Sequence, residues 1–574
     1  MKDNNAGTTP ASFRVIVPTR GEDVVRLDGT RLTVDEVVMV ARHGAQVVYS
    51  PEAIDRAHEK ERLLLAAVGQ GRPVYWVTRG TGKDRKITTY SGDPFSEEGR
   101  RELEDIQLRT FRGESPSLAV RARGPEIGDE ETVRAVLVVA ANTLVRRGAS
   151  APLLDAVVAL LNHRVAPVLL GRGSPGQGDL PQMSMVAQTL VGEGTAYHQG
   201  RRMPAREALR EAGLPELVPF GIDSGALIAS NAFSDGQAAL LVADAETMLN
   251  WADLVHVLSK LALNDSVTPL LPQLQSEERD KHQAWLARRV AALTRGSHLW
   301  EYDAERTLQG PLSFRDYFVL GGVAWKAWDR LRQEVERCIN TPGQNPALLP
   351  NLRPQDSWAL DTGWLRQFLV QDDEVSGYVV ASAGFERRGL DQEVGAFANA
   401  LAWVCAGAVQ RPLRLQDPFV NALANPETVP HGSLASRAQE GDYAAADLYA
   451  SLLADLAPLP PMTIPLIRGI EDLSPHTHAM VRRVRNAVDT ARDLVAEEAG
   501  AALAWLEVRR GHRPDMKLGP VASALLDACA EDVVLDGSYP DRPAPAVSFR
   551  AWMATVDPRA FMGPDVQARP DLLG

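Results

Sequence analysis

One glycine-rich segment has the residue types of a nucleotide site. Residues 80–83 read Gly-Thr-Gly-Lys, and a glycine loop ahead of a lysine can bind phosphate through its backbone N–H groups. That chemistry also requires a glycine five residues before the Gly-Lys pair and a serine or threonine after it. Val77 and Asp84 occupy those places, so we exclude nucleotide binding here.

Cysteine and histidine show no disulfide or metal pattern. Cys338, Cys405 and Cys529 are far apart and each lies in an apolar helical setting, so we expect all three to be buried. His476 and His478 are the one close pair of histidines, and a spacing of two on a helix points the rings to different sides. The sequence therefore predicts no metal site.

A second glycine-rich segment carries the main functional signal. Residues 171–180 read Gly-Arg-Gly-Ser-Pro-Gly-Gln-Gly-Asp-Leu. With their flanks, they resemble the aromatic amino-acid ammonia-lyases, histidine ammonia-lyase above all, in which the loop reads Gly-Ser-Val-Gly-Ala-Ser-Gly-Asp-Leu. In that family Ala-Ser-Gly cyclises into the electrophilic methylidene-imidazolone group.

This loop departs from the family pattern. Gln177-Gly178 stands where the family has Ala-Ser-Gly, one residue shorter, and no serine is present there to dehydrate. We therefore expect a divergent member of the family with no cofactor, in which Gln177 supplies an amide to the substrate. An unusual prosthetic group formed from Gly176-Gln177-Gly178 is the less favoured alternative.

The resemblance implies a catalytic base at Tyr75. Residues 74–82, Val-Tyr-Trp-Val-Thr-Arg-Gly-Thr-Gly, are similar to the family's Val-Tyr-Gly-Ile-Asn-Thr-Gly-Phe-Gly, whose tyrosine is the proposed base on a mobile lid. Lowering a tyrosine pKa from about 10 to about 7 requires about 4 kcal/mol of phenolate stabilisation. Arg79 and Lys83 are near enough in sequence to contribute. The alternative is an aromatic side chain packed in the core.

A second motif implies a carboxylate anchor. Residues 309–315, Gln-Gly-Pro-Leu-Ser-Phe-Arg, resemble the family's Gln-Asp-Pro-Tyr-Ser-Leu-Arg, whose arginine grips the substrate carboxylate. A guanidinium matches a carboxylate with two parallel hydrogen bonds, so we expect Arg315, with Gln309, to bind an anionic substrate group. Leu312 replaces the tyrosine and makes the site more apolar. The alternative is a surface ion pair between Arg315 and Asp316.

Three more positions match the family. Phe385, in Ser-Ala-Gly-Phe-Glu, matches the phenylalanine of Gly-Gly-Asn-Phe-His. Glu471 matches the glutamate of Ile-Pro-Thr-Ser-Ala-Asn-Gln-Glu-Asp, which lies close to the reacting amine, so we expect it to be catalytic. Asn231 lies in Ser-Asn-Ala, which corresponds, directly or with a shift of one residue, to the family's Asn-Gly-Thr that helps to hold the prosthetic group and its ligand. A polar residue inside a helix is the equal alternative for Asn231.

The retained positions handle a proton and a carboxylate, whereas the positions that build the electrophile are altered. We therefore expect a lyase, isomerase or cyclase that works by acid/base chemistry, without a prosthetic group, in specialised biosynthesis. Its substrate would be a small carboxylate derived from an amino acid, with an aromatic group suiting the apolar site. The alternative is a non-catalytic homologue that binds a ligand or joins a hetero-oligomer. The resemblance further implies a homotetramer with shared active sites.

Composition and charge limit the partners. The chain has 574 residues, of which 45% are hydrophobic and 24% charged, as is usual for a globular protein. Its net charge of −13 argues against binding to nucleic acid or an anionic membrane. No run approaches the roughly 18 apolar residues that span a bilayer, and residues 1–10 lack the apolar segment of a signal peptide. We expect a cytoplasmic protein.

Helical periodicity dominates the chain. Thr33 with Glu36 forms a capping box, and Ser50 followed by proline starts a second helix that ends near Gly69. Long proline-free stretches with apolar residues at helical spacing predict a bundle of long helices. These stretches are residues 223–263, 311–338, 389–409 and 476–510. Shorter helices are expected at residues 129–147, 153–162, 182–190 and 205–212, and a strand at residues 13–17.

We predict a mainly α protein, and the resemblance implies an ammonia-lyase/fumarase-like arrangement. A flexible tail (1–31) precedes an N-terminal domain (32–220) that carries the lid (74–90) and the degenerate loop (171–181). A central bundle of long helices (221–510) and a C-terminal segment (511–574) follow.

Overall fold

A computed structural model describes residues 13–115, 121–275, 277, 280–425, 429, 442–460, 464–533 and 544–567. The predicted lack of a leader at residues 1–10, and the first part of the predicted tail, lie outside these residues. No helix among the described residues is long and apolar enough to cross a membrane.

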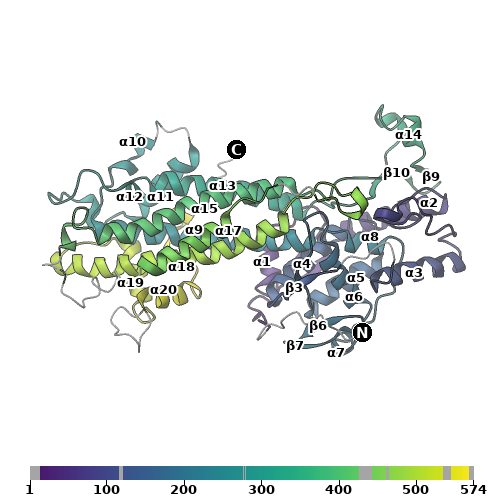
Figure 1. The fold of residues 1–574 in the computed structure, drawn as a ribbon, viewed down its shortest axis with the longest axis horizontal. Coiled ribbons are helices and arrows are strands. Elements are labelled where there is room, and N and C mark those ends of the chain that lie inside the picture. Colours follow the sequence, from purple (N-terminus) through teal and green to yellow (C-terminus); the bar gives the residue numbers. More distant parts are fainter. Residues whose placement is uncertain are drawn as a thin grey trace. The chain divides into compact units, whose positions relative to one another are not determined.

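The chain forms two compact units that alternate along the sequence (Figure 1). The first unit takes residues 1–240, 332–391 and 459–481, and the second takes residues 241–331, 392–458 and 482–574. The long helices have residues in both units; they are α9 (Ala232–Leu263), α13 (Tyr317–Ile339), α15 (Arg388–Leu415) and α18 (Thr477–His512). The domain ranges expected from sequence stay predictions.

The first unit begins with two helices whose caps confirm the sequence signals. Helix α1 (Val34–Ala41) has a capping box, in which Glu36 N–H donates to the Thr33 hydroxyl at 3.2 Å and Thr33 N–H donates to the Glu36 carboxylate at 2.8 Å. Helix α2 (Pro51–Gly69) is capped by Ser50, which accepts the Ala53 N–H. Each cap satisfies an N–H that the helix itself leaves unpaired.

Short helices and small sheets complete the first unit. The helices are α3 (Glu97–Phe111), α4 (Glu130–Leu144), α5 (Ala151–Asn162), α6 (Leu180–Leu190), α7 (Ala205–Glu211), α8 (Asp223–Ile228) and α14 (Gly363–Arg366). Strands β1 (Val24–Leu27) and β2 (Gln46–Tyr49) pair in parallel. The antiparallel sheets are β3 (Arg123–Glu126) with β5 (Leu170–Arg172), β4 (Val165–Pro167) with β6 (Thr195–His198) and β7 (Arg201–Pro204), and β8 (Ala347–Pro350) with β10 (Ser376–Val380) and β9 (Leu369–Gln371).

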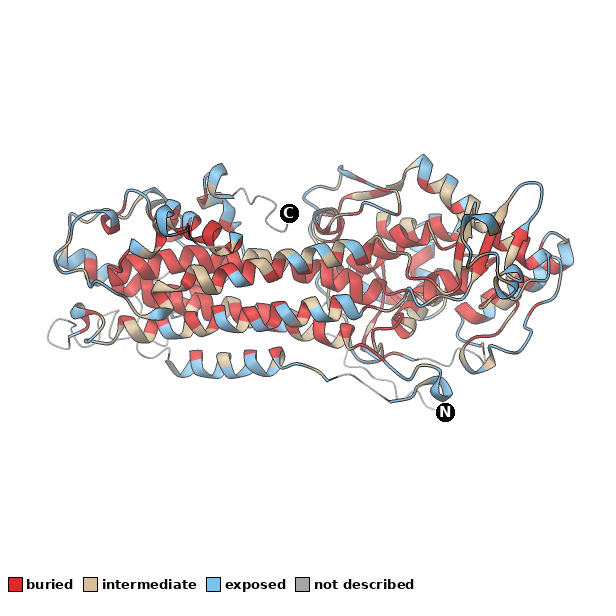
Figure 2. Cartoon of the chain, turned by 90° about the horizontal axis from the view of Figure 1, so that it is seen from above, coloured by how far each residue is buried: buried red, intermediate tan, exposed pale blue. Residues whose placement is uncertain are grey.

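The second unit is a bundle in which long helices run side by side (Figure 1). Helix α9 contributes much of the core, because among its residues only Ala243, Asp244, Glu246 and Thr247 are not buried. Figure 2 shows buried residues, in red, along most of the length of the long helices. The shorter helices are α10 (Pro272–Gln275), α11 (Lys281–Leu293), α12 (Leu312–Arg315), α17 (Asp442–Leu456), α19 (Pro520–Cys529), α20 (Pro545–Met553) and α21 (Pro564–Gln567).

Three buried polar side chains of the bundle form one hydrogen-bonded network. Glu498 accepts two hydrogen bonds from the Arg411 guanidinium, at 2.5 and 2.6 Å, and one from the Ser259 hydroxyl at 2.7 Å. Both charged side chains are almost completely buried, so each depends on the other to offset the loss of hydration. This network joins α9, α15 and α18 within the unit.

Two of the predicted long helices are interrupted. The stretch 223–263 breaks between α8 and α9, because the Ala229 carbonyl accepts from Arg147 at 2.6 Å and the Ser230 carbonyl accepts from the Asp179 N–H at 2.5 Å. These carbonyls therefore serve tertiary contacts instead of a continuous helix. The stretch 311–338 breaks at Asp316, between α12 and α13.

The mainly helical fold is confirmed, and Cys338, Cys405 and Cys529 are all buried, as expected. The expected strand at residues 13–17 is reduced to one bridge, between Arg14 and Asp129. The N-terminal segment is held there by Phe13, which stacks on Tyr197 with ring centroids 3.8 Å apart.

Candidate active site

The glycine-rich loop is anchored by a buried aspartate. Asp179 accepts hydrogen bonds from the Ser174 hydroxyl at 2.5 Å and from both the N–H and the hydroxyl of Ser234 at 2.7 Å. The loop backbone is left-handed at Gly176 (φ 87°), where a Cβ atom would lie 3.0 Å from the Thr477 backbone nitrogen. Only glycine fits this combination of conformation and close approach. The loop is therefore held at the beginnings of α9 and α18.

Gln177 connects the loop to two other segments. Its side-chain NH2 group donates to the Glu386 carboxylate at 2.8 Å and to the Leu473 carbonyl, and its side-chain oxygen accepts from the Ser474 hydroxyl at 3.1 Å. Both NH2 hydrogens are thereby used. The Gln177 amide therefore bonds the loop to two other chain segments, whereas the sequence suggested that it would face the substrate.

Tyr75 lies in a strained turn. Its neighbour Trp76 has a positive φ of 75°, a costly conformation for a bulky residue, and packs against Gly225, where a Cβ atom would meet the indole at 2.7 Å. The Thr78 hydroxyl closes the turn by accepting the Val74 N–H at 2.7 Å. The Tyr75 hydroxyl oxygen accepts the Gly82 N–H at 2.7 Å. The turn and this bond together fix the position of the phenol.

Glu471 is presented to Tyr75 by a tight loop. Leu466 N–H donates to the Glu471 carbonyl at 2.7 Å, and Ile467 and Arg468 both have positive φ. Ile467 touches the lid, since a Cβ atom on Gly82 would lie 2.5 Å from its Cγ2. The charge of Glu471 acts on the Tyr75 phenol. Leu473 and Ser474, which bind Gln177, follow two and three residues later. The structure therefore places Tyr75 within the electrostatic influence of Glu471, and it bonds Gln177 to the segment that directly follows Glu471.

Burial sets the protonation of both candidate catalytic groups. Loss of hydration raises the pKa of the Tyr75 phenol above its ordinary value; the Gly82 N–H bond lowers it, the Glu471 charge raises it further, and Arg85 lowers it. Burial also raises the pKa of the Glu471 carboxyl. From sequence, Arg79 and Lys83 were near enough to stabilise a phenolate, but the pKa is raised on balance and Arg79 donates to the Thr88 hydroxyl.

Two other predicted residues lie beside the loop and its partners. The Asn231 side chain donates to the Gly176 carbonyl at 3.5 Å, and its buried side-chain oxygen has no hydrogen-bond partner among the described residues. Phe385 is half-buried and directly precedes Glu386, the acceptor for Gln177. Next in the chain, the buried Arg387 pairs with Asp235 at 3.0 Å. His478 Nε2 donates to the Gly171 carbonyl at 2.9 Å.

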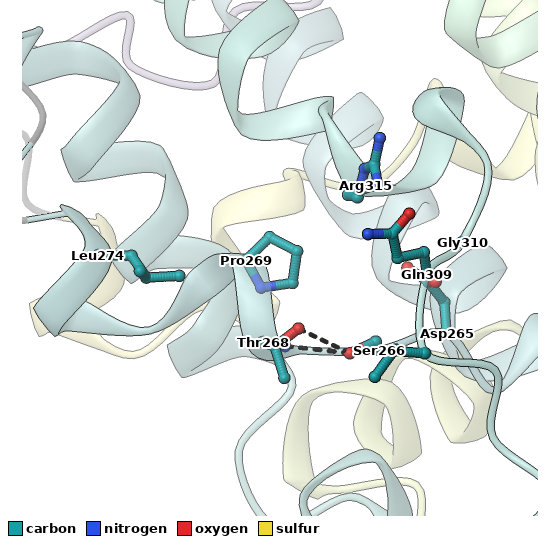
Figure 3. A pocket seen from close by; sticks show the side chains of 9 residues that line it. Asp265, Ser266, Thr268, Pro269, Leu274, Gln309, Gly310 and Arg315 are labelled. Carbon is teal, nitrogen blue, oxygen red and sulfur yellow. Dashed lines mark hydrogen bonds between the residues drawn. The ribbon is translucent and has the colours of Figure 1, made fainter.

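The predicted carboxylate anchor lies in the second unit. Gln309 and Arg315 line the same hollow, whose volume is about 450 Å³ (Figure 3). Arg315 is partly exposed, and its Nε lies 3.5 Å from the Asp316 carboxylate, the pairing considered as the alternative from sequence. Leu312 is largely exposed and does not line this hollow.

Some residues of the site were missed from sequence. Glu386 and Ser474 form hydrogen bonds with Gln177, and no motif in the sequence indicated that either residue would do so. Asp179 did carry a signal, because the Gly-Asp-Leu end of the loop motif is retained. Its role as the acceptor that anchors the loop follows only from the structure.

Solved structures with this fold are ammonia-lyases, aminomutases and a related degrading enzyme. Tyrosine aminomutase from Streptomyces globisporus matches with a TM-score of 0.77 and 22% identity, over 96% of this chain and all of that one. Ergothionase from Treponema denticola has a TM-score of 0.77 and 22% identity, over 94% of this chain and all of that one. Histidine ammonia-lyase from Trypanosoma cruzi has a TM-score of 0.75 and 20% identity, over 95% and 96%. The fold is thus the ammonia-lyase and aminomutase fold.

The chain belongs to the aromatic amino acid lyase family, whose pattern matches residues 32–531. It is 30% identical to a probable histidine ammonia-lyase of Halobacterium salinarum, over 88% of this chain and 91% of that protein. Histidine ammonia-lyase of Symbiobacterium thermophilum is 28% identical, over 88% and 92%. Histidine ammonia-lyase 2 of Fusobacterium nucleatum is 29% identical, but the match spans only 57% of this chain and 62% of that protein. The family and these relatives are enzymes.

These comparisons correct two predictions. The expected lyase, isomerase or cyclase working without a prosthetic group, with its non-catalytic alternative, is wrong, because the relatives are named as histidine ammonia-lyases. The expected lack of a cofactor is wrong for the same reason, since membership of this family implies the methylidene-imidazolone group. Both predictions rested on the altered loop at residues 176–178, whereas the similarity to histidine ammonia-lyases extends over most of the chain.

The residues of the loop nevertheless do not fit the cyclisation known from the resemblance. Gly176, Gln177 and Gly178 include no hydroxyl that could be lost as water, and the Gln177 amide is bound to Glu386, Leu473 and Ser474. The nearest loop hydroxyl, on Ser174, donates to Asp179. We therefore derive no step of the reaction through that group.

Proposed function

We propose that this chain catalyses an ammonia-lyase-type reaction on an α-amino acid with an aromatic or imidazole side chain. The named relatives support the reaction class, and members of the family act on small amino-acid substrates. The observation that carries the proposal is the half-buried Tyr75, whose hydroxyl accepts the Gly82 N–H at 2.7 Å and is influenced by the charge of the Glu471 carboxylate.

Tyr75 is assigned as the group that removes a proton from the substrate carbon next to the amine-bearing carbon. Because its pKa is raised, the phenol is protonated in the resting enzyme. We assign Glu471 as the acceptor of that proton, since burial makes its carboxylate a stronger base than usual. The Gly82 N–H then stabilises the phenolate that results.

Substrate binding is assigned to the other residues that match the family. Arg315 and Gln309 bind the carboxylate, and Phe385 contacts the apolar ring. Leu312 is exposed and lies outside the hollow that Arg315 lines, so no substrate contact is assigned to it. Asn231 offers its unpartnered side-chain oxygen to a substrate donor. Gln177 holds the walls of the site in place through its bonds to Glu386 and Ser474.

We also infer that the chain is a divergent member of its family, because Gly176-Gln177-Gly178 stands at the place of Ala-Ser-Gly. A homotetramer with shared active sites is proposed from the family resemblance. It would allow Arg315 of one copy to serve Tyr75 of another. A cytoplasmic location stays a prediction.

The test is ammonia release from L-histidine, L-phenylalanine and L-tyrosine by the full-length protein, with the unsaturated acid followed by its ultraviolet absorbance. The proposal expects release from at least one of these, in equal amount to the unsaturated acid. Intact mass of the same preparation shows whether residues 176–178 have lost water. Release from none of the three, by a folded protein, contradicts the proposal.

A further inference from the structure

The hollow that contains Arg315 has a second polar wall. The segment 264–269, the loop before α12 and α12 itself surround it, and Figure 3 shows Asp265, Gln309 and Arg315 around the same space. Its volume of about 450 Å³ is large enough for a free amino acid. The hollow lies within the second unit alone.

Asp265 is buried and only half satisfied. Its Oδ2 pairs with the Lys260 ammonium, which also donates to the Ser266 carbonyl at 2.7 Å. Its Oδ1 has no hydrogen-bond partner within the described part of the chain, although the side chain is only 1% exposed. A buried carboxylate oxygen without a donor is unfavourable, so the native arrangement is explained if a ligand supplies one.

Because Gly310 has no side chain, there is room beside it for Asp265 Oδ1. A Cβ atom on Gly310 would lie 2.0 Å from Asp265 Oδ1, so no other residue fits while the carboxylate stays in place. The similar family motif has aspartate at this position of the Gln-Asp-Pro sequence. In this chain Gly310 carries no carboxylate, and the Asp265 carboxylate, which follows the end of α9, lies beside it.

We propose that Asp265 Oδ1 selects ligands that carry a protonated nitrogen together with the carboxylate bound by Arg315. The Lys260 ion pair fixes the orientation of the Asp265 carboxylate through Oδ2, and among the described residues Oδ1 is left without a donor. Arg315 supplies the opposite charge across the same hollow. Free amino acids are the smallest molecules with both groups. The inference rests on the proposed function only in taking Arg315 as the carboxylate anchor.

The experiment compares two probes that differ only in the α-ammonium, L-phenylalanine and 3-phenylpropionate. Binding is measured by calorimetry on the full-length Tyr75→Phe protein, so that turnover does not interfere. We expect the amino acid to bind at least about ten times more tightly than the plain acid, the effect of one charge-assisted hydrogen bond. In Asp265→Asn this ratio should fall to about one.

Asp265→Asn leaves the buried Lys260 without its partner and could unfold. The double variant Lys260→Met with Asp265→Asn removes both charges and should give the same lost ratio in a folded protein. Thermal melting verifies folding of both variants. A preference for L-phenylalanine that survives in the folded double variant overturns the proposal, as does the absence of any preference in the parent.

Arg315→Gln separates this inference from the proposed function. If Arg315 anchors the carboxylate, this variant loses affinity for both probes while Asp265→Asn loses affinity for the amino acid alone. If Arg315→Gln binds both probes as the parent does, the anchor of the proposed function is wrong. In that case the ammonium site is still supported if Asp265→Asn lowers the ratio of the affinities for L-phenylalanine and 3-phenylpropionate.

Discussion

Replacing Gln177 by glutamate should destabilise the fold, because it exchanges the NH2 donor that faces Glu386 for a charged acceptor. The NH2 group that donates to Glu386 at 2.8 Å would become a carboxylate oxygen facing another one. Two unit charges at 2.8 Å repel by about 6 kcal/mol at an effective dielectric constant of about 20. Arg388, whose Nε lies 2.9 Å from the other Glu386 oxygen, offsets part of this, and we expect a net cost of about 3 kcal/mol.

The size-matched control is Gln177→Leu, which removes the bonds to Glu386 and Ser474 without adding charge and should cost about 2–4 kcal/mol. The extra cost in Gln177→Glu depends on pH. A repulsion of about 3 kcal/mol raises the folded-state pKa of the new carboxyl by about 2 units above its unfolded value of about 4.3. Below a pH of about 4 the new carboxyl is protonated, and the free energy of unfolding of Gln177→Glu carries no repulsion cost relative to Gln177→Leu. As the pH rises to about 6.5, the free energy of unfolding of Gln177→Glu falls by about 3 kcal/mol relative to that control.

Chemical denaturation of both variants between pH 4 and 8 measures this difference. The account expects the two stability curves to separate steadily up to pH of about 6.5 and to run parallel above it. Curves that coincide at every pH would show that Gln177 does not face Glu386 in solution. The hydrogen bond between Gln177 and Glu386 would then play no part in stability.

Two further predictions concern a buried ion pair of the second unit and the titration of Asp223 in the first unit. Arg411→Met leaves Glu498 buried without its partner and should cost about 3–5 kcal/mol by chemical denaturation, whereas Arg411→Met with Glu498→Leu should recover most of it; equal losses in both proteins would contradict the pairing. Burial raises the pKa of Asp223 to about 6, despite hydrogen bonds from Ser150 and Phe220. This carboxyl therefore stabilises the fold below pH of about 4, and the contribution of about 3 kcal/mol is lost as pH rises through 6. Asp223→Asn should flatten the dependence of melting temperature on pH between 4 and 6, and an unchanged slope would assign it to another group.

The helical fold could be predicted because local signals and long-range packing agree. Thr33 and Ser50 cap helices where their spacing indicated, and the apolar period of 389–409 and 476–510 corresponds to α15 and α18. The break at Ala229–Asn231 could not be predicted, because it depends on Arg147 and Asp179, which are distant in sequence.

The candidate site was predictable in its residues but not in its contacts. Tyr75, Glu471 and Gln177 could be named from motifs, yet the bond from Gly82 to Tyr75 depends on how the lid turns back on itself. The raised pKa of Tyr75 depends on burial and on the distant Glu471, neither of which can be read from the residues next to Tyr75 in sequence. Asp265 gave no signal at all, since nothing in sequence places it beside Gly310.

The most direct test of the central claim is the rate of ammonia release by Tyr75→Phe on the substrate found in the amino-acid screen. If Tyr75 transfers the proton, the rate should fall by about 100-fold to 10,000-fold with little change in melting temperature. Tyr49→Phe is the matched control, because the Tyr49 hydroxyl is buried and donates only to the Ala141 carbonyl at 3.2 Å. It should keep the parent rate. A Tyr75→Phe protein that releases ammonia as fast as Tyr49→Phe would contradict the account.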